Sequence, residues 1–513
     1  MKKIISLILV FIMLVSVVSC AGDPVNNDDT TDNVQDTVLE STEASDTATE
    51  TVNPNKVPAE KYNGVFKAGY ARTVITPELP APLDSLDGTV MTKLKDDLYA
   101  TCIAVNDGEN TALIYTVDVK NIGPVVYSTI LLRVSVATKV PKQNIIISAT
   151  HSHSAFTPLD NPSNSSSDSI KKWTSTLPAV MADIAKEAIA DMEDAEIYYA
   201  TANTPGMAFI RRHVHEDGSY SGVQTGAHIK SSSRVVGQVM DVDDTLQVLR
   251  LVRKEKKDII MTNWQAHLAA ARYMDGMTTT VTADLAYYVR TEVEKKSDDA
   301  LVAYFAGASG NVNLTPPSEL MRKYRNYSAV GISLAKLIVE TMTIENMTKL
   351  EAGKISGTSK TYAAEARKCT DAEKIAQANE VMALEEGSDA QKALMKKYGF
   401  ESLYAPKGII ASSKRTADTY DLYLSALSFG DLGFIGAPYE MFDNNGVQIK
   451  EGSPYNATFI LTGAGGYWAY MPSIEYFNEY GGYEVDDTSF AKGVAEKLVA
   501  EYLKMLKQIR GIS

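Results

Sequence analysis

The chain has 513 residues, of which 64 are acidic and 50 are basic, so its formal net charge at pH 7 is −14. Hydrophobic residues make up 45% of the sequence, which excludes a wholly disordered or collagen-like protein and is enough for a large core. The acidic balance argues against nucleic acid as a partner, because binding to a phosphate backbone needs clustered positive charge. Three cysteines are too few for a disulfide scaffold.

Residues 1–20 are typical of an export signal. Lys2 and Lys3 precede an apolar run from Ile4 to Val15, and the segment ends at Cys20. Its last four residues, Val-Val-Ser-Cys, resemble a bacterial lipobox, in which the cysteine becomes the lipidated first residue of the mature protein. We therefore expect a lipoprotein of the cell envelope, anchored to the membrane through Cys20 and facing outside the cytoplasm. An ordinary cleaved signal or a short transmembrane helix is the alternative, although the run is short for a span.

The next segment has the composition of a spacer. Residues 21–55 contain nine acidic residues and no Lys or Arg, with very little aliphatic material. Such a stretch cannot bury a core, and its charges repel one another. We predict an acidic, disordered tether over 21–60 and a folded domain over 61–513.

Short runs rich in β-branched and apolar residues alternate with helical patterns after the tether. Several of the runs are apolar on both faces, which favours layered mixed sheets flanked by helices over a one-sided antiparallel sheet. The sequence therefore predicts the α/β class. The expected strands are 100–105, 112–117, 144–150, 246–252, 258–264, 301–306, 422–429 and 457–462.

Three stretches have helical patterns. One covers 177–192, and a second lies at the C-terminus, where Thr488 or Ser489 is the expected cap of an apolar stripe that ends near Ile509. The third, at about 363–415, is rich in Ala, Lys and Glu and predicts a helical insertion between strands. It could be a lid over a site or a surface elaboration, and we expect the latter.

The chain has six histidines, and three of them follow apolar strands. Side chains two apart on a strand point the same way, so His151 and His153 are expected to project together beyond the strand at 144–150. His267 follows the strand at 258–264. Strand ends in one sheet can bring such imidazoles within coordination range, and we therefore predict a metal site there.

The other histidines are expected to have different roles. His213 and His215 have the same spacing but lie in a polar stretch that predicts a loop or hairpin, in contact with substrate or solvent. His228 is expected to be an ordinary solvated or hydrogen-bonded residue.

Two motifs resemble those of the neutral, non-lysosomal ceramidase family. Residues 68–77, Ala-Gly-Tyr-Ala-Arg-Thr-Val-Ile-Thr-Pro, are similar to the family's opening "A-G-x-A-R-x-D-I-T-P". Residues 149–154, Ala-Thr-His-Ser-His-Ser, look like its "T-H-T-H-S-G" motif, which is the more specific of the two. The resemblance covers most of residues 64–510 and implies a neutral-ceramidase-like catalytic domain.

The resemblance also implies a set of zinc ligands. The family's two histidine ligands fall on His151 and His267, its glutamate on Glu440 in Ala-Pro-Tyr-Glu, and its tyrosine on Tyr470 in Tyr-Trp-Ala-Tyr. Two nitrogens and two oxygens suit Zn²⁺. A tyrosine ligand is physically unusual, because its free pKa is about 10 and only a cation's field favours the phenolate at neutral pH.

The chain departs from the family pattern at several points. Asn313 stands where the family's "G-D-V-S-P-N" motif has its serine, and an amide can orient water or a carbonyl but cannot be a nucleophile. Leu268 replaces a proline that often follows the second histidine. Only Arg211 of the family's Asn-Arg pair is matched, because Ile210 precedes it. There is also no obvious room for the C-terminal β-sandwich of full-length ceramidases.

These residues together predict a zinc-dependent hydrolase at the cell surface. The expected mechanism is attack by water that zinc activates, with His153 transferring a proton or stabilising the oxyanion, Arg211 positioning a polar part of the substrate, and Asn313 orienting water or a carbonyl. The resemblance implies a ceramide-like N-acyl lipid, or a related amide or ester, as the substrate. The alternatives are a surface lipoprotein that binds lipid or glycan without turnover and, more distantly, an amidohydrolase-type metal hydrolase.

Overall fold

The computed structural model describes residues 53–59, 61–83, 88–161, 165, 167–222, 233–317 and 323–512. The expected signal, the lipobox with Cys20, most of the expected tether, and His228 therefore lie outside the described residues.

A large sheet forms one half of the fold. Its nine strands are β1 (Lys67–Val74), β5 (Tyr99–Asn106), β6 (Thr111–Val117), β7 (Ile145–Ala149), β8 (Glu193–Asn203), β13 (Thr245–Arg253), β14 (Asp258–Trp264), β16 (Ala300–Ala306) and β18 (Thr348–Leu350). They follow the order β16-β14-β13-β8-β1-β5-β6-β7, with β18 paired to β8. The sheet is mixed, because β6 runs parallel to β7 and β14 runs parallel to β16, whereas the other pairs are antiparallel.

A second, four-stranded sheet packs against the first. It consists of β19 (Ile355–Glu365), β20 (Thr419–Phe429), β21 (Leu432–Ala437) and β23 (Ala457–Thr462), in that order. The smaller sheets are β2 (Ala81–Pro82) with β3 (Val90–Met91), β4 (Lys93–Leu94) with β15 (Thr280–Val281), β9 (Phe209–Ile210) with β17 (Val312–Asn313), β22 (Glu440–Met441) with β24 (Tyr470–Met471), and β11 (Tyr220–Gly222), β10 (Arg212–His215) and β12 (Val235–Gln238).

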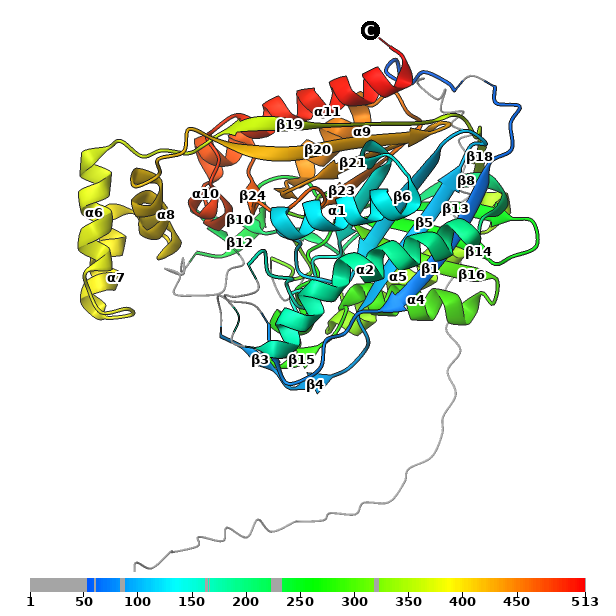
Figure 1. Ribbon diagram of the computed structural model, residues 1–513. Coiled ribbons are helices and arrows are strands. Elements are labelled where there is room, and N and C mark those ends of the chain that lie inside the picture. The colour runs from blue at the N-terminus through cyan, green and yellow to red at the C-terminus, as the bar shows by residue number, and fades with distance from the viewer. Residues whose placement is uncertain are drawn as a thin grey trace, which may run out of the picture. The chain divides into compact units, whose positions relative to one another are not determined.

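Helices cover the outer faces of both sheets, and α6, α7 and α8 lie to one side of the sheets (Figure 1). The helices of the described residues are α1 (Pro124–Thr138), α2 (Asp168–Ala190), α3 (Ala270–Tyr273), α4 (Leu285–Lys296), α5 (Tyr327–Thr341), α6 (Ala372–Met382), α7 (Asp389–Tyr398), α8 (Tyr404–Ser413), α9 (Asp443–Gly452), α10 (Tyr483–Asp487) and α11 (Val494–Arg510). One core joins α1, α2, α4 and α5 to the large sheet, a second lies between the sheets, and a third joins α9 and α11 to the small sheet. The layering confirms the predicted α/β class.

Strand β5 shows why the central strands read as continuous apolar runs. Cys102 and Ala104 face the helices, whereas Ile103 and Val105 face the second sheet, and all four are fully buried. A strand covered on both faces has no side on which polar residues are favoured, so its polar and apolar residues do not alternate. The eight strands predicted from such runs are all present.

The structure corrects several local expectations. Helix α2 starts nine residues before Leu177, at Asp168, with the Ser167 hydroxyl accepting from the Ile170 amide. Helix α11 begins after Gly493 and not at Thr488 or Ser489. Strands β1, β8, β19 and β21 were not predicted, because the first three are partly polar and β21 contains two glycines.

The strand ends that carry candidate site residues meet at one edge of the two sheets. His151 follows β7, His267 follows β14, and Glu440 lies just beyond β21. Strands β7 and β14 are far apart in the strand order, but the Thr116 hydroxyl on β6 donates to the Tyr304 carbonyl on β16 over 2.6 Å. The large sheet therefore curls until its two ends come together, and this curl brings the two histidine-bearing ends into one place.

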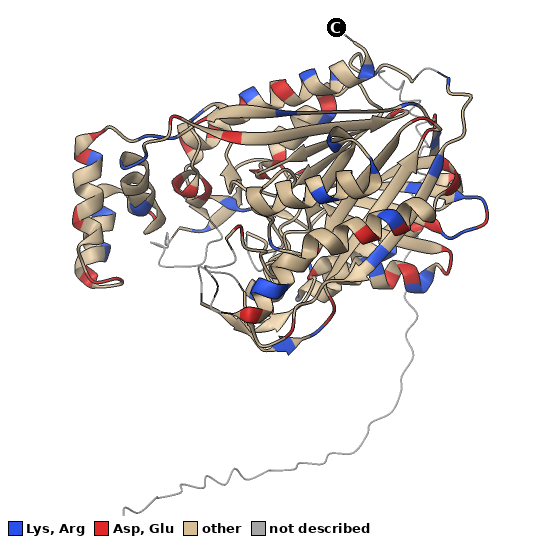
Figure 2. Cartoon of the chain, in the orientation of Figure 1, with Lys and Arg blue, Asp and Glu red and all other residues tan. Residues whose placement is uncertain are grey.

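The chain around the predicted tether and insertion also differs from expectation. Asn53 and Lys56 donate hydrogen bonds to carbonyls of 450–453, so contacts with the domain begin at 53 and not at 61. Helices α6, α7 and α8 occupy the predicted insertion, although 363–365 still belong to β19. Exposed Lys, Arg, Asp and Glu are interspersed on these helices (Figure 2). They are not a free surface elaboration as expected, because α8 packs against α10 next to the site described below.

Two further observations concern the described residues alone. Cys102 and Cys369 are both free. Among the residues with described coordinates, no helix has the length and apolar character that spanning a bilayer requires.

A buried ion pair between α4 and the segment after β6 gives a testable prediction about stability. The Arg290 guanidinium donates two hydrogen bonds to Asp118, over 3.0 and 2.6 Å, and both side chains are almost fully buried. Replacing Arg290 with Met leaves the buried Asp118 carboxylate without its positively charged partner. We therefore expect Arg290→Met to lower the free energy of unfolding by about 3–5 kcal/mol in urea denaturation.

The matched control is Arg234→Met, which removes an exposed guanidinium that pairs with Glu216 over 3.4 Å. Its effect should stay below about 1 kcal/mol. Equal losses in the two variants would contradict the importance of the buried pair.

Candidate functional site

Backbone carbonyls orient the two predicted histidine ligands. The Nδ1 atom of His151 lies 2.7 Å from the Lys120 carbonyl oxygen, and that of His267 lies 2.8 Å from the Ser309 carbonyl oxygen. A carbonyl oxygen can only accept, so each Nδ1 carries the hydrogen and each Nε2 is left to act as a ligand. Such outer hydrogen bonds fix the tautomer and the ring orientation of metal-binding histidines. His151 holds this position with a left-handed backbone, at φ +62°.

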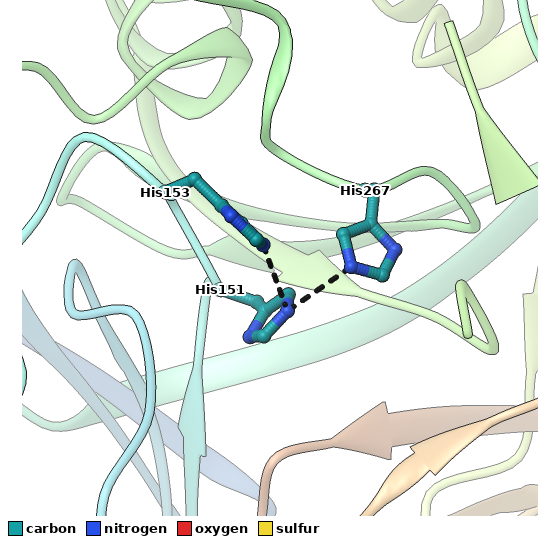
Figure 3. A group of neighbouring side chains, drawn as sticks. All are labelled: His151, His153 and His267. Atoms are coloured by element: carbon teal, nitrogen blue, oxygen red, sulfur yellow. Dashed lines mark hydrogen bonds between the residues drawn. The ribbon is translucent and has the colours of Figure 1, made fainter. Parts of the chain in front are cut away.

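The free nitrogens converge with a carboxylate oxygen. The Nε2 atoms of His151 and His267 are 3.2 Å apart, and Glu440 Oε2 lies 3.5 Å from the first and 3.1 Å from the second. Figure 3 shows the imidazoles of His151, His153 and His267 gathered around one point. Ligands about 2.0–2.1 Å from a tetrahedral metal ion are roughly 3.3 Å from one another, and the observed distances match this spacing. The donor set therefore fits a divalent transition-metal ion.

Glu440 is held in position by two contacts. It lies on β22 beside β24, and the Tyr467 hydroxyl donates to its Oε1 atom. Its Oε2 atom is buried with no hydrogen-bond partner in the described part of the chain, which leaves it for the two imidazoles. Burial by itself would raise the pKa of Glu440, but the positive charge that His151 and His267 carry when protonated lowers that pKa well below its usual value. Glu440 is therefore stabilised as a carboxylate by positive charge beside it.

His153 is the third imidazole of the cluster. Its Nε2 atom is 3.3 Å from that of His151, and one ligand atom from each of His151, His153 and His267 lies within 4.8 Å of the others. Burial, together with the two neighbouring imidazoles, lowers the pKa of His153 well below its usual value. Its Nδ1 atom has no partner among the residues that the structure describes. His153 is thus a neutral imidazole that can either bind a metal or accept a proton.

Tyr470 and Arg211 form the adjoining wall. The Arg211 guanidinium donates to the Tyr470 hydroxyl over 3.2 Å and to the Gly310 carbonyl over 3.3 Å, and its Nε pairs with Glu484 over 3.1 Å. The Tyr470 ring stacks on His267 with centroids 6.3 Å apart. Burial and the nearby Glu440 raise the pKa of Tyr470, against the opposing effect of Arg211, so its phenolate form requires a cation.

A cavity of about 280 Å³ opens onto this cluster. Its lining includes His153, Arg211 and Asn313, which places all three predicted catalytic residues at one cavity. The lining also includes the mostly apolar side chains of Ala269, Ala270, Tyr273, Met274 and Leu314. Asn313 reaches the cavity from β17, which pairs with β9 directly before Arg211. The cavity is therefore lined by both polar and apolar side chains.

Asn311 has a structural role that the sequence did not reveal. Its side-chain oxygen accepts from the Asp443 amide over 2.8 Å, and its amide donates to the Tyr476 hydroxyl over 3.1 Å. Next to it, the Gly310 amide donates to the Met441 carbonyl, and a Cβ at Gly310 would lie 2.6 Å from the Glu440 carbonyl oxygen. The loop after β16 is thereby fastened to the segment that carries Glu440.

The second histidine pair lies apart from the cluster. His213 and His215 are on β10, in the small sheet with β11 and β12, which agrees with the predicted hairpin. His215 contacts the Ser233 carbonyl and the Ser221 hydroxyl through its two nitrogens, over 2.6 and 2.7 Å. Neither belongs to the metal-like group found among the described residues.

Sequence reasoning missed the residues that act through backbone atoms or across the fold. Lys120 and Ser309 contribute carbonyl oxygens, for which the sequence carries no signal. Glu484 and Tyr483 come from a distant segment, while Tyr467 was visible only as the first tyrosine of Tyr-Trp-Ala-Tyr.

Comparison with solved structures identifies the architecture. The neutral ceramidase from Pseudomonas aeruginosa aligns with a TM-score of 0.64 over 88% of this chain and 75% of its own, at 15% identity. The chain has the neutral ceramidase fold. A second structure, described as a ceramidase complexed with C2, aligns with this chain at a TM-score of 0.62. The alignment covers 88% of this chain and 76% of its own, at 13% identity. No protein-family profile and no curated protein sequence matches the chain.

The converging donor atoms predict metal binding. We expect the metal-free protein to bind one Co²⁺ ion, used as a spectroscopic probe, with the visible absorption of a site that has four or five ligands. His151→Gln should weaken this binding at least about 100-fold, because a ligand with its own orienting hydrogen bond is lost.

His215→Gln is the matched control, since it removes a buried histidine outside the cluster and should bind Co²⁺ as the unchanged protein does. If the unchanged protein binds no Co²⁺, or if both variants bind equally well, the cluster is not a metal site.

Proposed function

We propose that the protein is a zinc-dependent hydrolase that cleaves the amide bond of a ceramide-like N-acyl lipid or a related amide or ester. The observation that carries this proposal is the convergence of two Nε2 atoms and one carboxylate oxygen, 3.1–3.5 Å apart, beside a cavity lined by both polar and apolar side chains. A purely binding protein has no need of such a donor set.

Zinc is the metal that suits these donors. His151, His267 and Glu440 would hold it, with Tyr470 as the fourth ligand, and two nitrogens with two oxygens match the preference of Zn²⁺. When bound, zinc supplies Lewis-acid activation of water and of a scissile carbonyl.

The protein's own residues account for the remaining steps. His153 is neutral, faces the cavity and can take a proton from the attacking water and pass it to the leaving amine. The Arg211 guanidinium, fixed by Glu484, can hold a polar group of the substrate. The Asn313 amide can donate to a developing oxyanion. Because Asn313 carries no nucleophile, the attacking group is water.

The cavity supports a substrate with both polar and apolar parts. Tyr273, Met274 and Leu314 offer an apolar surface to an acyl chain, while the amide reaches the histidines. A volume of about 280 Å³ holds only part of a long-chain lipid, so the rest would extend outside. The similarity to structures named ceramidases supports an N-acyl lipid as the substrate class.

The location of the enzyme is part of the proposal. The lipobox-like Val-Val-Ser-Cys and the acidic stretch after it support an anchor on Cys20 and a tether to the membrane. A catalytic domain on such a tether would meet lipid substrates at the outer side of the membrane.

The hydrolase proposal is tested with a panel of N-acyl lipids, including ceramides, and of matched esters. We expect at least one to be cleaved, with activity lost after treatment with a chelator and restored by added Zn²⁺, as measured by release of the free fatty acid. If no member of the panel is cleaved in a zinc-dependent way, the proposal is wrong and a non-catalytic lipid-binding role is favoured.

The roles of Tyr470 and His153 give a separate prediction. Tyr470→Phe removes a ligand and should weaken Zn²⁺ binding at least about tenfold. His153→Gln should leave the zinc content near that of the unchanged protein and lower kcat about 10²–10⁴-fold, because it removes the proton-transferring group. Zinc content is measured by atomic emission and kcat by product release. The opposite pattern, with zinc lost only in His153→Gln, would make His153 the ligand in place of Tyr470.

A further inference from the structure

The helical insertion, residues 366–418, holds a segment that forms one wall of the cavity. We call residues 480–489 the wall segment. At the two stems of the insertion, Arg367 donates to the carbonyls of Val485 and Asp486, and Arg415 donates to the Ser489 carbonyl over 3.2 Å. Figure 1 shows α6 and α8 at the end of the fold where α10 lies. Both ends of the insertion therefore donate hydrogen bonds to the backbone of the wall segment.

A third arginine links the wall segment to the middle of the insertion. Arg212 donates two hydrogen bonds to Glu401, over 2.7 and 2.8 Å, and its Nε donates to the Tyr480 carbonyl over 2.7 Å. Its guanidinium is almost fully buried, whereas the Glu401 side chain is 48% exposed. Two parallel bonds between Arg and a carboxylate fix both distance and orientation, so this pair is more than an ordinary surface ion pair.

Helix α8 also packs against the wall segment without an intervening side chain. A Cβ at Gly408 would lie 2.1 Å from the Asp486 carbonyl oxygen, so only glycine permits this approach. One turn earlier, the Tyr404 ring contacts the edge of Tyr483 with centroids 4.5 Å apart. Helix α8 therefore contacts the wall segment both through close backbone packing at Gly408 and through the aromatic pair of Tyr404 and Tyr483.

The wall segment in turn holds the residues of the site. Tyr483 lines the cavity and meets Tyr470 with ring centroids 5.3 Å apart. Glu484 pairs with Arg211, and the Thr488 hydroxyl donates to the Tyr470 carbonyl over 2.9 Å. The insertion is therefore separated from the cavity by this one segment.

Two glycines precede helix α10 in the wall segment. Gly481 and Gly482 adopt positive φ angles of 59° and 103° and contribute no side chains to packing. Their nearest added-Cβ neighbours would be atoms of Arg212, the residue that binds Glu401. The position of Tyr483 therefore depends on groups outside the segment.

We propose that the insertion is the outer support of the substrate-binding wall, and that Glu401 and Tyr404 are positioning residues that set where Tyr483 and Glu484 stand. They act through Arg212 and Tyr483 and do not touch the substrate. This inference rests on the proposed hydrolase function for its effect on substrate binding. Loss of either contact is expected to loosen the cavity wall and weaken substrate binding without changing the metal cluster.

The test compares Glu401→Gln and Tyr404→Ala with Glu386→Gln in the full-length protein. Glu386 is exposed between α6 and α7 of the same insertion, so its replacement makes the same change of charge away from the wall. Hydrogen–deuterium exchange of residues 480–489 should become roughly three- to tenfold faster in the first two variants and stay unchanged in the control. KM for the cleaved lipid should rise by a similar factor, with kcat and zinc content within about twofold of the unchanged protein.

The two readouts separate this inference from the hydrolase proposal. If the unchanged protein cleaves nothing, the hydrolase proposal fails, and the exchange rates alone decide whether the insertion supports the wall. Unchanged exchange of 480–489 in both Glu401→Gln and Tyr404→Ala would overturn the inference. So would faster exchange with an unaltered KM, or an equal rise of KM in Glu386→Gln.

Discussion

The site depends on a single arrangement, in which acceptor atoms from distant parts of the chain face one another at short distance. The Nδ1 hydrogens of His151 and His267 are committed to backbone carbonyls, so their Nε2 atoms meet at 3.2 Å with at most one hydrogen between them. The Glu440 carboxylate closes the triangle. Bare acceptors buried this close together repel one another, and a bound cation removes the repulsion while giving each atom a partner.

The rest of the fold can be understood as support for that arrangement. The large sheet curls, with a side-chain hydrogen bond from β6 to β16, so that the C-terminal ends of β7 and β14 lie close together. The segments that follow the second sheet bring Glu440 and Tyr470 to the same edge. Asn311 fastens the loop after β16 to the segment after Glu440. Beyond these, the insertion contacts the wall segment through its own Arg367 and Arg415, and through Glu401, which binds Arg212. Support for the site therefore extends to helices α6, α7 and α8, none of whose described residues lines the cavity.

Local patterns in the sequence were sufficient for eight strands, among them β7 and β14 with the histidines that follow them, because a strand buried on both faces is visible as an apolar run. They missed β1 and β8 in the middle of the large sheet, whose sequences are partly polar. The family resemblance added Glu440 and Tyr470. The structure places Glu440 Oε2 3.1 and 3.5 Å from the two imidazoles and stacks the Tyr470 ring on His267, and the role of either as a ligand stays a prediction. The sequence could not show that β7 and β14 meet, since this follows from the curl of the whole sheet. It also could not reveal the Lys120 and Ser309 carbonyls, which are chemically the same in every residue. The insertion was expected to be a surface elaboration because its helices are highly charged. Instead, Arg367 and Arg415 at its two ends donate to backbone carbonyls of the wall segment, and its Glu401 accepts from Arg212, which also donates to the Tyr480 carbonyl.

X-ray absorption at the zinc edge of the purified protein tests the central claim most directly. The arrangement described here, with water beside the protein ligands, predicts an ion with four or five nitrogen and oxygen neighbours at about 2.0–2.2 Å and the outer-shell scattering of two imidazoles. A spectrum showing six oxygen neighbours and no imidazole, or a protein that retains no zinc after purification in its presence, would contradict it.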